Sequence, residues 1–180
     1  MNVLKGLICA VGASLALSGL AAATVLDFED LVDQNPVPDG YGGVVDWGDW
    51  WYYDWPQSPY VPHSGNVRVY NIGDGHFTFE EPVIFEGAWF AGYGTGDGFL
   101  PINFQFYLDG DLVHTSDSID LIPDDQAYWL GSGYSGWVDH VVVQGSLGFF
   151  VMDDVQFVPG PGALALLSLG VLGLARRRRA

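Results

Sequence analysis

Residues 104–114 read Phe104-Gln105-Phe106-Tyr107-Leu108-Asp109-Gly110-Asp111-Leu112-Val113-His114. A short run of aromatic and aliphatic residues lies on each side of Asp109-Gly110, with the period-two alternation of a half-buried β-strand. Asp-Gly is a strong signal for a two-residue hairpin turn, because both central positions of that turn require a positive φ. This stretch therefore predicts an antiparallel β-hairpin.

The same pattern recurs through the body of the chain, where short aromatic or β-branched runs are bounded by Gly, Pro, Asp and Asn. No stretch of the body shows a convincing helical stripe. The pattern predicts strands near residues 25–31, 66–72, 76–80, 83–93, 102–108, 112–116, 127–130, 136–144 and 147–157. This number of short strands and turns favours an all-β fold, an antiparallel two-sheet β-sandwich of jelly-roll type.

The charge of the body is strongly negative. All 22 acidic residues of the chain lie between Asp27 and Asp154, and Arg68 is the one basic residue in that range, so its net charge is −21 with neutral histidines. Such a charge makes nucleic acid and anionic lipid head groups poor partners and favours cation binding. We interpret Arg68 as a structural residue that holds a carboxylate in place, in preference to one that binds an anionic ligand.

Residues 1–23 have the pattern of a signal peptide for the Sec translocon. A short positive segment is followed by an apolar run over residues 6–17 and by small residues that predict cleavage after Ala23. The predicted structure of this segment is an N-terminal helix. Cys9, the only cysteine, lies within it, so the exported domain would fold without disulfides.

The C-terminal residues 158–180 have three parts. Pro159-Gly160-Pro161 is followed by an apolar run from Ala163 to Ala175 and then by Arg176, Arg177, Arg178 and Arg179. A helix over the apolar run would be somewhat short for a bilayer core, and the arginines would keep their end on the cytoplasmic side. The alternative is a plain C-terminal anchor or a helix that lies on the membrane surface.

This three-part tail resembles the PEP-CTERM sorting signal of Gram-negative bacteria. The resemblance implies transient anchoring in the inner membrane, followed by cleavage near Pro159 by an exosortase-type enzyme and release to the cell surface or extracellular matrix. The signature of the family is Pro-Glu-Pro, whereas this chain has Gly160 at the middle position. The glycine leaves the sorting prediction unchanged and affects the prediction of efficient cleavage by the exosortase-type enzyme.

The body, residues 24–157, resembles the galactose-binding-like jelly roll. The resemblance rests on the opening Leu26-Asp27-Phe28-Glu29-Asp30-Leu31, the central Gly87-Ala88-Trp89-Phe90 and the closing residues 149–157. In that fold the first and last strands lie side by side. The same pairing is therefore expected here.

A pairing of the terminal strands would bring Asp27 and Glu29 close to Asp153 and Asp154. Several hard oxygen donors with negative charge suit Ca²⁺. Similar jelly rolls hold a structural calcium ion with one carboxylate from each terminal strand, and this resemblance implies Glu29 and Asp154 as ligands, with Asp153 next. The alternative is that these are solvated carboxylates that protect strand ends.

An aromatic cluster extends from Trp47 to Trp55 in a context rich in Gly, Asp and Pro. Flat rings stack on the apolar faces of sugars while carboxylates accept hydrogen bonds from the hydroxyl groups. The predicted carbohydrate-binding residues are Trp50, Trp51, Tyr53, Trp55 and Asp49. The alternative is that Trp47 and Trp50 close the bottom of the core and the remaining rings pack over an open sheet edge.

Signals for catalysis are weak. His63, His76, His114 and His140 lack the spacing of metal ligands, and Asp139 beside His140 has no nucleophile motif with it. The sequence therefore favours a non-catalytic, exported protein of the envelope or matrix, a structural or adhesive component of an exopolysaccharide or biofilm layer. The alternative is a carbohydrate-binding module that uses the aromatic cluster, with polysaccharide as its partner.

Overall fold

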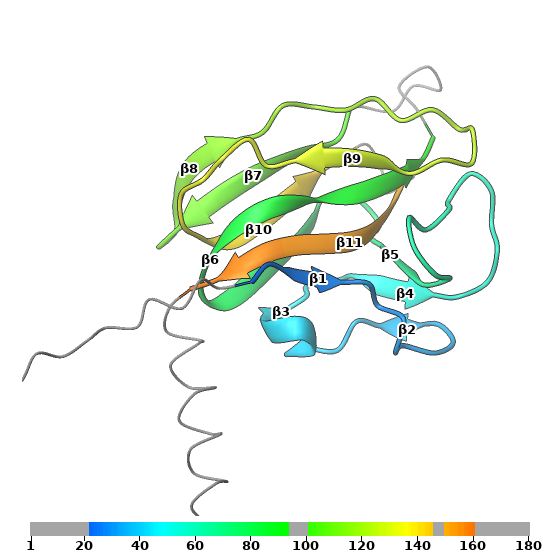
Figure 1. Ribbon diagram of the computed structural model, residues 1–180, viewed down its shortest axis with the longest axis horizontal. Helices are drawn as coiled ribbons and strands as arrows, with labels where there is room; N and C mark the ends of the chain where they lie inside the picture. The colour runs from blue at the N-terminus through cyan, green and yellow to red at the C-terminus, as the bar shows by residue number, and fades with distance from the viewer. Residues whose placement is uncertain (1–21, 94–100, 146–149, 161–180) are drawn as a thin grey trace, which may run out of the picture.

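The structure, a computed structural model, describes residues 22–93, 101–145 and 150–160. These residues form an almost entirely β fold with a single short 3₁₀ turn, η1 (Tyr41–Gly43). Figure 1 shows the chain coloured along its length, with the two ends of the described body lying on the same side of the molecule. Within these ranges, no helix is both long enough and apolar enough to cross a membrane.

Eleven strands form one antiparallel sheet. They are β1 (Thr24–Leu26), β2 (Asn35–Pro36), β3 (Val44–Asp46), β4 (Trp51–Tyr53), β5 (Arg68–Tyr70), β6 (Gly75–Gly92), β7 (Asn103–Leu108), β8 (Asp111–Thr115), β9 (Tyr128–Gly131), β10 (Val138–Gln144) and β11 (Phe150–Pro159). The main path runs β2-β4-β5-β11-β6-β10-β7-β8, with β1 on β11 and with β3 and β9 on β6.

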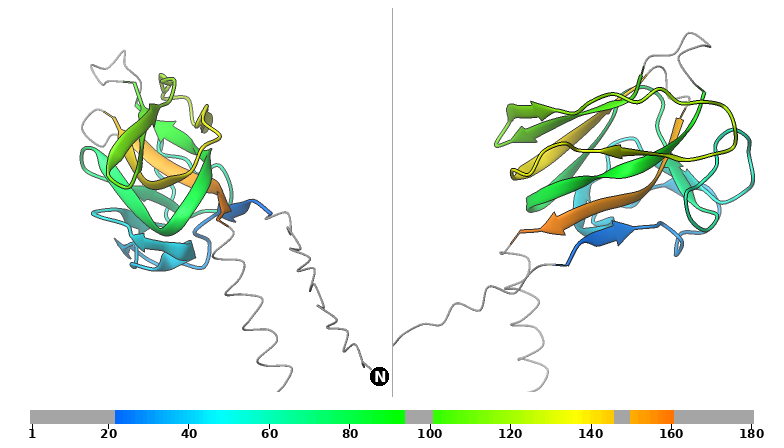
Figure 2. Two further views of the ribbon diagram at one scale, coloured as in Figure 1. Left: turned by 90° about the vertical axis from the view of Figure 1, so that its left-hand side faces the viewer. Right: turned by 45° about the horizontal axis from the view of Figure 1, so that its top comes forward.

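Strand β6 organises the sheet because it is long enough to have two partners along each side. Its first half pairs with β10 on one side and β3 on the other, and its second half pairs with β9 and β11. The exposed neighbours Glu80 and Glu81 interrupt its alternation at the changeover, and Pro82 follows them. The sheet curls around the core as a result, which is clearest in Figure 2.

The predicted hairpin is confirmed. Residues Asp109 and Gly110 have φ angles of 53° and 86°, and Leu108 pairs with Asp111 across the turn. The predicted pairing of the terminal strands is also confirmed, with Leu26 opposite Val155 in β1 and β11.

The other predicted strands are confirmed in the described residues with shifted ends. Two of the predicted strands are a single strand in the structure. The segments 76–80 and 83–93 are one continuous strand, β6, because Pro82 lies where the partner changes and its missing N–H is tolerated. Strands β2, β3 and β4 were not predicted; each has only two or three residues, too few for a period-two pattern.

The all-β, antiparallel prediction is confirmed at the level of one large sheet. The finer division into two packed sheets does not appear in the hydrogen bonding, because β6 connects the strands on both of its sides without a break. The two predicted flanking helices fall on residues 1–21 and 161–180, outside the described residues.

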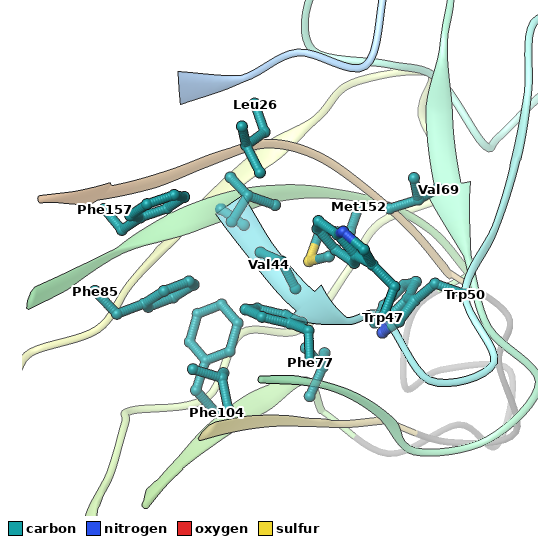
Figure 3. Close-up of a cluster of buried hydrophobic side chains, with 14 of the residues drawn as sticks. Leu26, Val44, Trp47, Trp50, Val69, Phe77, Phe85, Phe104, Met152 and Phe157 are labelled. Atoms are coloured by element: carbon teal, nitrogen blue, oxygen red, sulfur yellow. The ribbon is translucent and has the colours of Figure 1, made fainter. Parts of the chain in front are cut away.

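The core lies inside the curl and is rich in aromatic rings. Phe77, Phe85 and Phe104 point inward from β6 and β7 and meet Trp47 and Trp50 from the segment before β4 (Figure 3). The ring centroids of Phe85 and Phe104 are 5.1 Å apart, and those of Trp47 and Phe77 are 5.3 Å apart. These separations are typical of favourable aromatic pairs.

Candidate functional site

The connection between β4 and β5 covers part of the outer face of the sheet. We call residues 54–67 the covering segment. A second, smaller hydrophobic cluster lies beneath it, formed by Tyr53, Ala91 and Val151 of the sheet with Tyr60 and Val61 of the segment. The covering segment is therefore packed on the sheet although it contains no strand or helix.

Two adjacent carboxylates of β11 hold the middle of the covering segment. Oδ2 of Asp153 accepts hydrogen bonds from the backbone N–H groups of His63 and Ser64, at 2.8 and 2.9 Å. The carboxylate of Asp154 receives Ser64 Oγ at 3.1 Å and lies 2.5 Å from His63 Nδ1. Asp154 has a φ of 45° at a bulge of the strand, which allows consecutive side chains to serve one loop.

Glu29 holds the end of the same segment from the opposite terminus of the chain. Its Oε1 accepts the backbone N–H groups of Asn66 and Val67 at 2.8 and 2.7 Å. Its carboxyl group occupies the space where a side chain at Gly65 would begin. Glu29 and Asp153 thus accept backbone N–H groups of one loop, and Asp154 accepts the side-chain hydroxyl of Ser64 in the same loop.

Asp153 is the most buried of these groups, and only 1% of its surface is exposed. Burial raises the pKa of Asp153 to about 7, and the charge of Asp154 acts in the same direction. The hydrogen bonds from Ser64, Asp154 and His63 lower the pKa and offset part of the effect of burial. The cluster therefore contains one carboxyl group that titrates near neutral pH.

Three of the four predicted calcium ligands converge on the covering segment, namely Glu29, Asp153 and Asp154. The fourth, Asp27, is exposed and accepts the N–H of Glu29 at 3.3 Å. In the described ranges, no group of three or more His, Cys, Asp or Glu side chains is arranged to hold a metal ion. The oxygens at the centre of the cluster have N–H and O–H donors as partners, and the calcium site stays a prediction.

Arg68 anchors both ends of the covering segment. Its Nη1 donates to the carbonyl of Asn66 at 2.7 Å, and its Nη2 donates to the carbonyl of Trp55. The guanidinium lies 4.0 Å above the ring of Tyr53, and only 1% of the residue is exposed. Its Nε is buried and has no hydrogen-bond partner within the described residues.

The sequence interpretation of Arg68 was right about a structural role and wrong about its partners. In the part of the chain that the structure describes, the guanidinium bonds backbone carbonyls and no carboxylate. The carboxylates in turn bond backbone N–H groups. No motif in the sequence indicates these pairings, because the backbone groups that Arg68, Glu29 and Asp153 bond belong to a loop without a recognisable pattern.

Some of the predicted carbohydrate-binding residues are buried and others are exposed. Trp50 is completely buried, and its Nε1 donates to the carbonyl of His76 at 3.1 Å, so its ring is unavailable to a sugar at the surface. Tyr53 is also buried, beneath Arg68. Trp51 and Trp55 are 40% and 43% exposed, and Asp49 is exposed as well.

A row of aromatic rings on the outer face was not predicted. His63 stacks on Trp89 with centroids 3.6 Å apart and ring planes 9° apart. Trp89 lies opposite Trp129 on neighbouring strands, with centroids 5.6 Å apart. The indole of Trp129 lies against Gly87, where a side chain would overlap with it. The period-two alternation could have placed Trp89 on the outer face, but it could not indicate His63, which stacks on that ring from a loop.

The histidines do not form the arrangement of a hydrolase in the described residues. Asp139 accepts the N–H of Asp109, whereas His140 Nδ1 pairs with Thr78 Oγ1 at 2.8 Å. Asp154 does hold His63, yet the neighbouring hydroxyl of Ser64 bonds Asp154 and not the imidazole. His140 thus contacts a hydroxyl group while Asp139 bonds a backbone N–H, and His63 contacts a carboxylate that takes the nearby hydroxyl for itself, so neither histidine connects a carboxylate to a hydroxyl group in the described residues.

A pocket of about 360 Å³ lies beside the covering segment. Its wall includes the side chains of Asp54, Gln57, Tyr60 and Arg68, and Asp125 borders it from the connection that precedes β9. Burial raises the pKa of Tyr60 to about 12. A second pocket of about 300 Å³ lies at Asp74, between the ends of other strands.

The two predicted processing sites lie at the ends of the folded body. Ala23 is exposed and directly precedes β1, and Pro159 is the last residue of β11, paired with Val83 of β6. Gly160 is buried, and a Cβ at this position would lie 2.5 Å from the carbonyl oxygen of Pro82. The other predicted sorting residues, Pro161, Arg176, Arg177, Arg178 and Arg179, lie outside the described residues.

Comparisons with family models, with curated proteins and with solved structures gave no match for this chain.

Proposed function

We propose that this chain is an exported, non-catalytic protein of the bacterial envelope or extracellular matrix, sorted by its PEP-CTERM-like tail. It would act as a structural or adhesive component of an exopolysaccharide layer. The proposal rests on one observation: the first and last strands of the folded body begin and end at the two predicted cleavage positions. Strand β1 begins at Thr24 and β11 ends at Pro159, so removal of residues 1–23 and of the residues after Pro159 would leave every described strand intact.

The body suits a location outside the cytoplasm. Its only cysteine lies in the predicted signal peptide, so export to an oxidising compartment creates no unpaired thiol. Its loops are held by buried charged groups, which resist opening in a protein without disulfides. The adjacent terminal strands support a galactose-binding-like jelly roll, with two packed sheets as the finer description of the curled sheet.

The packing of Gly160 supports a specific form of the sorting step. A glutamate at this position, as in the family signature, would collide with the Pro82 carbonyl unless the end of β11 detached from β6. Glycine therefore lets Pro159 and Gly160 stay packed on the body. We propose that the processing enzyme acts on this chain only when the end of β11 opens, and that processing is slow for this reason.

The sorting proposal can be tested by expressing the full chain in a Gram-negative host that has an exosortase. We expect the protein in the surface or matrix fraction, with Thr24 as the N-terminal residue by mass spectrometry. Replacing Arg176, Arg177, Arg178 and Arg179 with glutamine removes the charge that fixes the orientation of the tail and should deplete that fraction. Retention of the unprocessed chain in the cytoplasm would refute the proposal.

The processing step has its own test. Gly160→Glu should increase the cleaved fraction several-fold, because the bulkier residue detaches position 160 from the Pro82 carbonyl. Gly160→Ser introduces a Cβ at the same place without restoring the family signature, so it should also increase the cleaved fraction if packing controls processing. Equal cleavage of all three proteins would show that packing at Gly160 does not control processing.

The calcium ion is a separable part of the proposal. A melt of the protein with EDTA and with CaCl₂ should show a shift of several degrees if the folded state alone binds the ion. Glu29→Gln should abolish that shift if Glu29 is a ligand. Without a shift, the carboxylates have only the backbone donors described above as their partners.

A carbohydrate-binding module is the second candidate function. The exposed rings of Trp51 and Trp55 and the row formed by His63, Trp89 and Trp129 favour it. Stacking on sugars needs exposed ring faces beside polar groups. The pocket next to Trp55 adds the concave site that these surface rings lack.

A further inference from the structure

We propose that the pocket bordered by the covering segment and Asp125 is a binding subsite for one neutral sugar unit of a polysaccharide. The inference rests on the proposed function, because it gives the matrix protein a contact with the glycan around it. It differs from the predicted site at Trp50 and Tyr53, whose rings are buried.

The size and composition of the pocket fit a sugar. Its volume of about 360 Å³ is at the lower end of the range for small-molecule sites, about 300 to 1,000 Å³. Asp54 and Asp125 provide acceptors for hydroxyl groups, and Gln57 and Asn66 provide both donors and acceptors. Tyr60 and the neighbouring prolines add apolar surface of the kind that contacts a sugar ring.

The charges of the wall exclude the other common ligands. Two carboxylates in a body of net charge −21 repel phosphate and uronate groups. The guanidinium of Arg68 in the same wall opposes a metal ion or an ammonium group. A neutral ligand with several hydroxyl groups can use both kinds of side chain at once.

The pocket is held in a fixed shape before any ligand binds. Arg68, a lining residue, connects the carbonyls of Trp55 and Asn66 near the two ends of the covering segment. Glu29 and Asp153 hold backbone donors from His63 to Val67. Preorganisation lowers the entropic cost of ordering a loop on binding, which matters most for weak ligands such as sugars.

Arg68 also contributes a built polar feature to the pocket wall. It is one of the lining residues, it is almost completely buried, and its Nε–H has no acceptor among the described residues. A buried donor without a partner is destabilising. A sugar that binds beside Arg68 would change the electric field at this buried N–H through the guanidinium and its carbonyl bonds.

The experiment uses the full chain labelled with ¹⁵N and observes the arginine Nε–H signals. Comparison with Arg68→Lys assigns the signal of Arg68. D-glucose, D-galactose and N-acetyl-D-glucosamine are added as neutral probes, and D-glucuronate is the anionic probe. We expect at least one neutral sugar to shift the Arg68 signal and the indole signal of Trp55 with a saturating concentration dependence, and glucuronate to have no effect.

Two matched variants localise the binding. Asp54→Asn removes one charged acceptor from this pocket and should weaken binding about tenfold or more. Asp74→Asn makes the same change in the second pocket and should leave the affinity unchanged. Unchanged chemical shifts elsewhere in Asp54→Asn confirm that its fold is intact.

Three results would overturn the subsite: no shift with any neutral sugar, an equal response to glucuronate, or equal weakening by the two variants. The proposed function has an independent readout, the matrix fraction and the N-terminus at Thr24. A protein that reaches the matrix but binds no probe refutes the subsite alone, whereas a sugar-binding protein that stays in the cytoplasm refutes the matrix role alone.

Discussion

The β7–β8 hairpin and the covering segment have fixed conformations for different reasons. In the hairpin, residues pair through the backbone around Asp109-Gly110, and the paired residues are three to ten positions apart in the chain. In the covering segment, the backbone groups bond side chains that are far away in the chain, such as Glu29 and Asp153. Local turn chemistry is sufficient for the first, and the second exists only when the whole sheet has formed.

The largest expected effect comes from Arg68→Ala in the covering segment. The substitution removes a buried side chain and leaves the carbonyls of Trp55 and Asn66 without their charged donor. We expect the free energy of unfolding to fall by about 3 to 5 kcal/mol, or the melting temperature by roughly 10 to 20 °C. Circular dichroism melts measure this.

The control for Arg68→Ala is Thr115→Ala, an exposed position on β8 of the hairpin. We expect a change within about 0.5 kcal/mol there. Arg68→Lys should give an intermediate loss, because an ammonium group keeps the charge but cannot bridge two carbonyls with a planar fork. Similar melting of Arg68→Ala and wild type would contradict a structural role for the guanidinium.

A pair of glycines compares the two regions directly. Gly65 and Gly110 both have positive φ, 52° and 86°. A Cβ at Gly110 meets nothing within 4 Å, whereas a Cβ at Gly65 would displace the carboxyl group of Glu29. Gly110→Ala should cost about 1 to 2 kcal/mol for the backbone conformation alone.

Gly65→Ala should cost about 1 to 2 kcal/mol more, because Glu29 must move and lose its bonds to Asn66 and Val67. Urea unfolding at constant pH measures both losses. In a Glu29→Ala background the extra cost should disappear, since the displaced carboxyl group is no longer there. Equal losses for the two glycine variants in the wild-type background would mean that Glu29 does not restrain the segment.

What could be predicted from the sequence follows the same division. The hairpin at Asp109-Gly110, the strand pattern and the pairing of the chain ends were all predictable, because each leaves a local signal or follows from a recognised pattern. The grouping of Glu29, Asp153 and Asp154 was foreseen from that pairing. Their hydrogen-bond partners were not, because residues 63–67 carry no motif that marks them as the loop that these carboxylates bind.

The aromatic cluster shows the same limit. Composition placed Trp50 and Trp51 together in a candidate site, yet one is fully buried and the other is exposed. Strand β4 begins at Trp51, and three residues are too few to show in the sequence which side faces the core. A ring such as Trp89 could be placed on the outer face by alternation, but its stacking partner His63 comes from the covering segment.

A smaller effect with a characteristic pH dependence is expected for Asp153→Asn. Both side-chain oxygens of Asp153 accept backbone N–H groups, whereas asparagine has only one acceptor oxygen. At pH 5 we therefore expect the free energy of unfolding to fall by about 1 to 3 kcal/mol. Because burial raises the pKa of Asp153 to about 7 in the folded protein, the folded state binds a proton more tightly than the unfolded state. The wild type therefore loses stability as the pH rises through that pKa.

Asp153→Asn has no carboxyl group that titrates at this position, so its melting temperature should approach that of the wild type between pH 5 and pH 8. Melts at several pH values measure the convergence. Hairpin variants such as Gly110→Ala should keep a constant difference from the wild type over the same range. A difference for Asp153→Asn that widens with pH would mean that the carboxyl group is stabilised in its ionised form.

The smallest expected effect belongs to Asp109→Asn in the hairpin turn. Asparagine adopts positive φ more readily than most residues, and position 109 has a φ of 53°. The substitution also removes one negative charge from a body with an excess of them. We expect a gain of about 0.5 kcal/mol or less, measurable by urea unfolding against the wild type. A gain that persists in the Arg68→Ala background would show that the hairpin and the covering segment contribute independently, as expected for one region stabilised by its own sequence and another stabilised by the finished sheet.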